Sequence, residues 1–161
     1  MNTQLDEVQR NESAIRRLYE ECINPGRLEL LPELLDPEFT GGRGERGPEG
    51  FAESVRNLRK GFSDLSFTIE DLFGGRDRVA VRWTMRGRHT GPFAGVAASG
   101  VTVSQVGVVI YQMRDGRALQ SALHPDRLGL YQQIGVIGPL ETGFLVKPAA
   151  DGAQAAARSA A

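Results

Sequence analysis

Several residues and features that narrow a protein's function are scarce in this sequence. It has one cysteine, two histidines and one tryptophan among 161 residues. Because the single Cys22 cannot form an internal disulfide, we expect a protein of the reducing cytoplasm. The first 14 residues are polar, and no apolar run approaches the roughly 18 residues that span a bilayer. The sequence therefore predicts a soluble chain without a signal peptide or a membrane segment.

Charge and motifs exclude further classes of protein. The formal net charge is -1 and the isoelectric point is about 6.1, so no basic surface for nucleic acid or an anionic membrane is expected. The chain has no G-x-S-x-G nucleophile elbow, no Walker loop, no dinucleotide fingerprint and no H-E-x-x-H. Histidine, cysteine and carboxylate residues do not cluster at ligand spacing, so we expect no metal site.

The length and the hydrophobic periodicity predict one α+β domain over residues 1–146. Three helices should come first and a run of long strands second, so we expect a curved antiparallel sheet wrapped around three N-terminal helices, with a cone-shaped cavity. The Ala-rich tail over 147–161 has little to bury and is expected to be flexible. The predicted helices cover 5–23, 28–35, 47–60 and 128–135, and the predicted strands cover 65–73, 79–89, 101–113 and 118–126.

Alternation in two of these strands distinguishes an inner face from an outer face, since successive strand residues point to opposite sides. From Val79 onward one face is mostly apolar, and the other carries arginines and threonine. The strand over 101–113 is apolar on both faces, because Val106, Val108 and Ile110 occupy its second face. Such a strand is central or is covered by a second copy, so we expect a homodimer or a higher homo-oligomer formed through the sheet.

With these motifs absent, general acid–base catalysis is the remaining kind of chemistry, and Asp126 and His89 are the candidate catalytic residues. Asp126 closely follows the last predicted strand, where an apolar wall would raise its pKa and make it a usable proton acceptor. The competing interpretation is a helix cap for the turn that follows, a common task for aspartate. His89 ends the alternating face that contains Trp83, so its ring either faces the cavity mouth or hydrogen-bonds to loop backbone.

The candidate substrate-binding residues are aromatic or polar side chains expected near the cavity. Trp83 and Tyr111 could stack on a planar ligand, and Tyr19 could present a hydroxyl, although such residues more often simply pack in the core. Gln105 needs a hydrogen-bond partner if it is buried, which a ligand carbonyl could supply. His124 either contacts Asp126, faces solvent or takes part in catalysis.

Five segments together resemble the SnoaL-like polyketide cyclases, a family within the nuclear-transport-factor-2-like cone superfamily. No one of the segments is specific, but their order and spacing are, and the resemblance covers about residues 10 to 137. The segments are Arg17-Leu-Tyr-Glu-Glu, Gly47-Pro-Glu-Gly-Phe, Trp83-Thr-Met-Arg-Gly-Arg-His-Thr-Gly-Pro-Phe, Ile110-Tyr-Gln-Met-Arg-Asp-Gly-Arg and Asp126-Arg-Leu-Gly-Leu-Tyr-Gln-Gln-Ile-Gly.

The resemblance implies a cofactor-independent cyclase that closes a ring of an aromatic, anthracycline-like polyketide ester by intramolecular aldol condensation. One aspartate of the family acts as general acid and base, and the motif matches it to Asp126. His89 or Gln105 would then hydrogen-bond the developing oxyanion. The implied partner is a small aromatic polyketide, with no cofactor, nucleic acid or membrane.

The sequence departs from the family where many members carry a His-Trp pair, five and four residues before the aspartate. Ser121 and Ala122 occupy these positions here. This change alters the expected cavity wall and leaves two alternatives open. One is a cofactor-independent hydroxylase of an anthracycline-type polyketide, and the other is a noncatalytic small-molecule-binding or dimerisation module.

Overall fold

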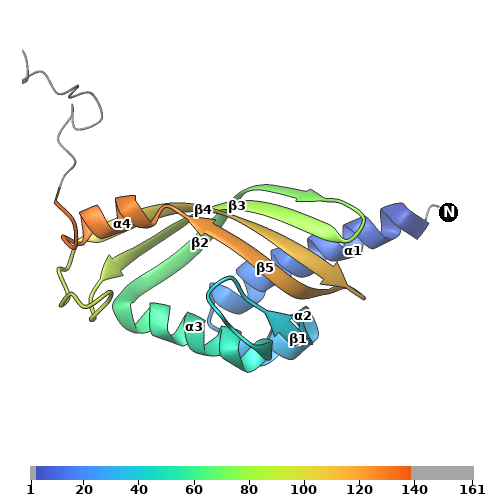
Figure 1. Ribbon diagram of the computed structural model, residues 1–161, viewed down its shortest axis with the longest axis horizontal. Coiled ribbons are helices and arrows are strands. Elements are labelled where there is room, and N and C mark those ends of the chain that lie inside the picture. The colour runs from blue at the N-terminus through green and yellow to red at the C-terminus, as the bar shows by residue number, and fades with distance from the viewer. Residues whose placement is uncertain (1–2, 139–161) are drawn as a thin grey trace, which may run out of the picture.

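The computed structural model of the protein describes residues 3–138. Its fold is the predicted α+β cone: a five-stranded curved sheet with helices packed against its concave face (Figure 1). The predicted tail over 147–161 and the domain limit at residue 146 lie outside the described residues. Within residues 3–138, no helix is long and apolar enough to cross a membrane.

The helical part begins with α1 (Thr3–Arg17), which continues into a π-helical segment η1 (Leu18–Ile23). A short 3₁₀ turn η2 (Leu28–Leu30) leads into α2 (Leu31–Leu34), so the second predicted helix is shorter than expected. Helix α3 (Gly47–Gly61) matches the helix predicted over 47–60 and has a proline in its first turn. The last helix, α4 (Arg127–Gln133), follows the sheet.

Four antiparallel strands form the predicted part of the sheet: β2 (Phe62–Gly74), β3 (Arg78–His89), β4 (Thr102–Arg114) and β5 (Arg117–Pro125). The spatial order is β1-β5-β4-β3-β2. Register shifts interrupt the β2–β3 pairing twice, and Asp64 adopts a left-handed φ of 52° within the first shift. Such bulges increase local twist and help the sheet to curve.

The fifth strand, β1 (Leu35–Thr40), was not anticipated from the sequence. It pairs with β5 in parallel, so the sheet is mixed and not wholly antiparallel. β1 is short and contains Pro37, which cannot donate a ladder hydrogen bond and which suits an edge strand. The sequence pattern predicts a helix end and a loop here, because Asp36-Pro37 is a typical turn dipeptide.

The predicted alternation of faces is confirmed in both central strands. Inward residues of β3 and β4 are buried and pack with η1, α2 and α3 into one core. On the opposite face of β4, Val106, Val108 and Ile110 are 49%, 39% and 41% exposed.

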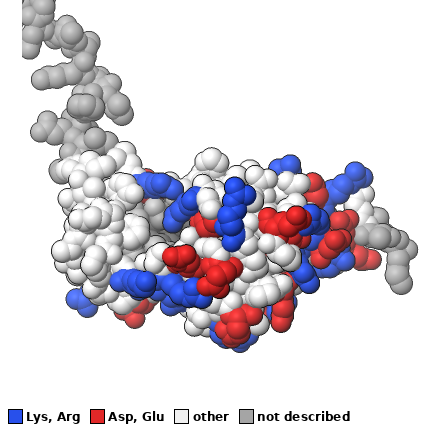
Figure 2. Space-filling model, turned by 60° about the horizontal axis from the view of Figure 1, so that its bottom comes forward, with Lys and Arg blue, Asp and Glu red and all other residues white. Residues whose placement is uncertain are grey.

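Lysines and arginines are interspersed with acidic residues over the face drawn in Figure 2.

Candidate active-site cavity

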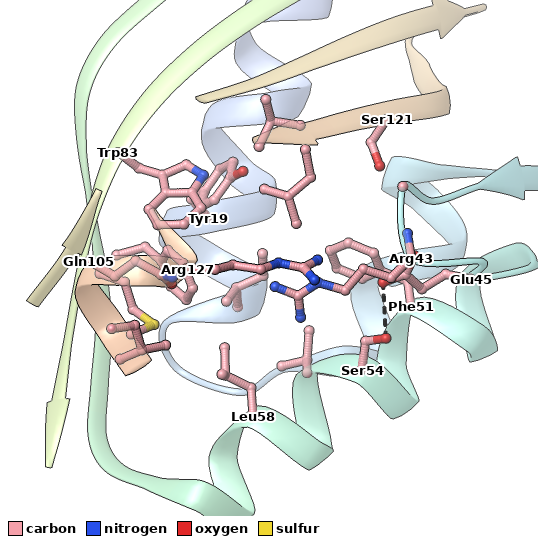
Figure 3. Close-up of a pocket in the computed structure, with 18 of the residues that line it drawn as sticks. Tyr19, Arg43, Glu45, Phe51, Ser54, Leu58, Trp83, Gln105, Ser121 and Arg127 are labelled. Atoms are coloured by element: carbon pink, nitrogen blue, oxygen red, sulfur yellow. Dashed lines mark hydrogen bonds between the residues drawn. The ribbon is translucent and has the colours of Figure 1, made fainter. Parts of the chain in front are cut away.

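A cavity of about 550 Å³ opens between the concave face of the sheet and the helices that cover it. Its walls come from η1, α3, α4, the inner faces of β2 to β5 and the loop over 41–46 (Figure 3). This volume lies within the range of about 300–1,000 Å³ typical of small-molecule sites. The predicted cavity therefore exists, and its lining can be compared with the predicted residues.

Four of the predicted substrate-binding residues, Tyr19, Trp83, Gln105 and Tyr111, lie in this cavity wall. Their role in binding stays a prediction. The hydroxyl groups of Tyr19 and Tyr111 lie 2.8 Å apart and hydrogen-bond to each other. Burial raises the pKa of both phenols, so both are neutral donors and acceptors at physiological pH.

The position of Tyr19 depends on the π-helical turn and on its anchor to the sheet. The amide of Asn24 closes the turn by donating to the carbonyl oxygen of Tyr19 at 2.9 Å. The Asn24 side chain then pairs with the backbone of Phe67 in β2 through two hydrogen bonds of 2.9 and 2.7 Å. π-Helical turns recur at functional sites, and this one fixes a tyrosine at the cavity.

Trp83 lies on the inner face of β3 with its indole edge-on to Phe67, the ring centroids 5.0 Å apart. Its Nε1–H is buried and has no hydrogen-bond partner among residues 3–138. Opposite it in β4 is Gly107, where a Cβ atom would come within 2.5 Å of the indole ring. A glycine is therefore required for the indole to lie across this strand.

Gln105 is buried at 5% exposure and does have a partner. Its Nε2 donates to the main-chain carbonyl oxygen of Asp126 at 2.9 Å. The side chain thus links β4 to the start of α4, and its remaining carbonyl oxygen is an acceptor at the cavity wall.

Asp126 and His124 lie outside the set of residues that line this cavity. Both are exposed and border a shallow depression beside Val106 and Val108 on the outer face of the sheet. Asp126 is the N-cap of α4, and its Oδ1 accepts a hydrogen bond from the amide of Gly129 at 2.9 Å. The side chain thus performs the predicted alternative task of a helix cap, while its catalytic role stays a prediction.

His89 is fully buried and is likewise absent from the cavity lining. Its Nδ1 accepts a hydrogen bond from the backbone amide of Ser99 at 3.2 Å and lies 2.9 Å from the Ser99 hydroxyl oxygen. The ring packs on Phe62 with a centroid distance of 5.4 Å. Of the two predicted positions for the His89 ring, the structure has the one in which the ring hydrogen-bonds to loop backbone. The ring thereby fixes the loop after β3.

Three charged residues line the cavity that sequence reasoning did not select: Arg43, Glu45 and Arg127. Glu45 supplies the carboxylate in the described part of the wall, and its Oε1 accepts a hydrogen bond from the Ser54 hydroxyl at 3.0 Å (Figure 3). Only weak sequence features could have indicated these three cavity residues: two charges in a Gly-rich loop and an arginine directly after Asp126.

The altered family position also lies in this wall. Ser121 is buried and lines the cavity, whereas Ala122 lies on the outer face of β5. The departure at residue 121 therefore places a small hydroxyl group where many members of the resembled family have an imidazole.

This architecture defines a class of small α+β cone proteins with one aromatic-walled cavity for a small molecule. The model of the SnoaL-like polyketide cyclase family matches residues 13–134. The chain therefore belongs to that family, and the predicted class, a polyketide cyclase, is confirmed.

Individual relatives agree with this assignment. Aklanonic acid methyl ester cyclase DnrD of Streptomyces peucetius is 30% identical over 154 residues, covering 89% of this chain and 99% of the relative. Aklanonic acid methyl ester cyclase AcmA of Streptomyces galilaeus is 32% identical over 129 residues, covering 76% and 89%. The solved structure of TsrD from Streptomyces laurentii superposes with a TM-score of 0.71 at 32% identity, covering 82% of this chain and 97% of TsrD.

Proposed function

We propose that this cyclase closes a ring of an aromatic polyketide ester by intramolecular aldol condensation without a cofactor. The observation that carries the proposal is the cavity, whose aromatic walls suit a flat polycyclic ligand and whose lining includes the carboxylate of Glu45. Relatives named aklanonic acid methyl ester cyclases support the substrate class.

In the proposed reaction a base removes a C–H proton that is acidified by neighbouring carbonyl groups. The enolate attacks a second carbonyl carbon of the same molecule, a C–C bond forms, and the resulting alkoxide takes up a proton. No atom is gained or lost. The cavity contributes by holding the two reacting carbons together and by positioning the base.

Two carboxylates are candidates for that base. The family motif favours Asp126, which would have to release the Gly129 amide and turn from the outer face toward the cavity. The geometry favours Glu45, which already lines the cavity, although it also holds the loop over 41–46 through the amide of Arg43. The side chain of Gln105, in the cavity wall, donates a hydrogen bond to the main-chain carbonyl oxygen of Asp126 and thereby connects Asp126 to the cavity.

The test is turnover of a tricyclic anthraquinone methyl ester by wild type, Asp126→Asn and Glu45→Gln, with and without dioxygen. Removal of a general base should reduce kcat by about 10²- to 10⁴-fold in one of the two variants. Asparagine still caps a helix, so Asp126→Asn tests proton transfer separately from capping. Glu70→Gln, at an exposed glutamate of β2, serves as the matched control. Product formation that requires dioxygen would contradict the cyclase and favour a hydroxylase.

We further propose that the protein is a homodimer formed through the outer face of the sheet. Val106, Val108 and Ile110 form an exposed apolar row there, with Ala122 of β5 beside it. Val108→Lys should yield a monomer in light scattering, whereas Val136→Lys, at a valine of the same 39% exposure, should not. A wild-type monomer at micromolar concentration would contradict the proposal.

A cytoplasmic location is also proposed, because the single Cys22 is a buried free thiol. Recovery of the native protein in the periplasmic or extracellular fraction of its producing cells would contradict this.

A further inference from the structure

Two arginines enter the cavity from opposite walls. Arg43 lies in the loop between β1 and α3, and Arg127 is the first residue of α4. Figure 3 shows the two guanidinium groups converging in the middle of the cavity, between the aromatic floor at Tyr19 and Trp83 and the face of α3. Residues 84 positions apart in the chain therefore direct like charges into one space.

Neither guanidinium forms a hydrogen bond or an ion pair with any residue in the range 3–138. Glu45 is the nearest acid along the loop, but its carboxylate is used to shape that loop. Its Oε2 accepts from the Arg43 amide at 2.8 Å and its Oε1 accepts from Ser54. The loop is closed by the Gly41 amide, which donates to the Glu45 carbonyl oxygen at 3.0 Å. The loop thus fixes the backbone of Arg43 and leaves the guanidinium available.

The two positive charges converge in one cavity. Burial and the positive charge of Arg127 together lower the pKa of Arg43. Arg43 and Arg127 keep solvent-exposed surface, as Arg86 does on the outer face of β3, but only the first two line the cavity. Two guanidinium groups that converge in one cavity repel each other, and an anion between them would turn that repulsion into two favourable contacts.

We propose that Arg43 and Arg127 form a clamp for a carboxylate group of the aromatic substrate. A guanidinium presents its donors in a planar fork that matches the two oxygens of a carboxylate. The aromatic body of such a ligand would lie on the side of Tyr19 and Trp83. The relatives named above are cyclases of a methyl ester, in which the corresponding acid is neutralised. Because the ester of the proposed substrate is uncharged, the clamp would hold a second, ionised carboxylate on the same molecule, and this requirement refines the proposed function.

The test compares anthraquinone-2-carboxylate with its neutral analogue anthraquinone-2-carboxamide. Quenching of Trp83, the single tryptophan of the chain, reports binding in this cavity. Wild type should bind the carboxylate at least about tenfold more tightly than the carboxamide, since charge-assisted hydrogen bonds are the stronger kind. This preference should decrease as salt concentration rises.

Arg43→Gln and Arg127→Gln should each weaken carboxylate binding and leave carboxamide binding nearly unchanged. Affinity for the carboxamide therefore also reports whether each variant keeps an intact cavity. Arg86→Gln is the matched control and should retain the full preference. Equal binding of the two ligands by wild type, or a preference that survives the double variant, would overturn the clamp.

Binding of these probes is independent of turnover, so the clamp and the cyclase reaction can fail separately. A chain that discriminates acid from amide but closes no ring would retain the clamp and lose the proposed function. A chain that closes the ring of the methyl ester without any preference for acid ligands would retain the proposed function and lose the clamp.

Discussion

The hydroxyl pair of Tyr19 and Tyr111 allows a quantitative prediction about the cavity floor. The side chains come from η1 and β4, are 3% and 2% exposed, and hydrogen-bond to each other at 2.8 Å. Replacing one tyrosine with phenylalanine removes one hydroxyl and leaves the other in a buried site without its partner. Replacing both removes the polar pair and leaves two apolar rings of the same shape.

The magnitude follows from this asymmetry. Leaving a buried polar group unsatisfied costs about 1–3 kcal/mol, whereas replacing both partners with apolar groups of the same shape is nearly neutral. We therefore expect Tyr19→Phe and Tyr111→Phe each to lower the free energy of unfolding by about 1–2 kcal/mol. The double variant should lose no more than one single variant, which gives a coupling energy of about 1 kcal/mol or more.

The assay is urea unfolding of wild type, the two single variants and the double variant, followed by Trp83 fluorescence. Tyr131→Phe is the control, because Tyr131 is a half-buried cavity residue without a side-chain hydrogen bond to the described residues. It should change the unfolding free energy by less than about 0.5 kcal/mol. Single-variant costs that are below that value and simply add would refute the reasoning, because cavity water would then be satisfying each hydroxyl separately.

Three further predictions concern the frame around the cavity. Asp126→Ala should destabilise the protein by about 1 kcal/mol through loss of the helix cap, whereas Asp126→Asn should be nearly neutral in the same urea titration. Gly107→Ala should cost about 1–3 kcal/mol and shift the emission of Trp83, because the added methyl group overlaps the indole. Asp36→Asn should lower the urea midpoint at pH 7, because the hydrogen bonds from Arg114, of 2.9 and 2.6 Å, hold the pKa of Asp36 below its usual value. That stabilisation is present above the unfolded-state pKa of about 3.9 and is lost as the pH falls through the lower folded-state value, so variant and wild type should converge in acid.

Much of the fold was predictable because the central strands follow a strict period of two. Alternation in β3 correctly assigned Val81, Trp83 and Met85 to the buried face. The alternation in β4 is equally regular. It therefore places Gln105 and Tyr111 on the same face of that strand, and both line the cavity. These predictions required only that the strands be long and regular.

The rest depended on contacts between distant segments, which no local pattern reveals. β1 is a strand because β5 offers it a free edge, and Pro37 hides this in the sequence. Arg43 reaches the cavity through the conformation of a loop, and Glu45 fixes that loop with its own side chain. A charged residue in a Gly-rich loop is usually solvated, so only the assembled cavity indicates a different role for Arg43.

The segment from Asp126 to Gly129 illustrates how one motif can have two physical meanings. A Cβ atom on Gly129 would lie 2.2 Å from a carboxylate oxygen of Asp126, so a side chain at position 129 would oblige the capping carboxylate to shift. The Asp-x-x-Gly spacing, which the family resemblance associates with catalysis, therefore also leaves room for this cap. If Asp126 transfers protons, it must leave the cap during turnover, and the cost of about 1 kcal/mol is small enough for thermal motion to supply. A capped resting state and a catalytic role are thus energetically compatible, and activity of the cap-preserving Asp126→Asn variant distinguishes a residue with both roles from a cap alone.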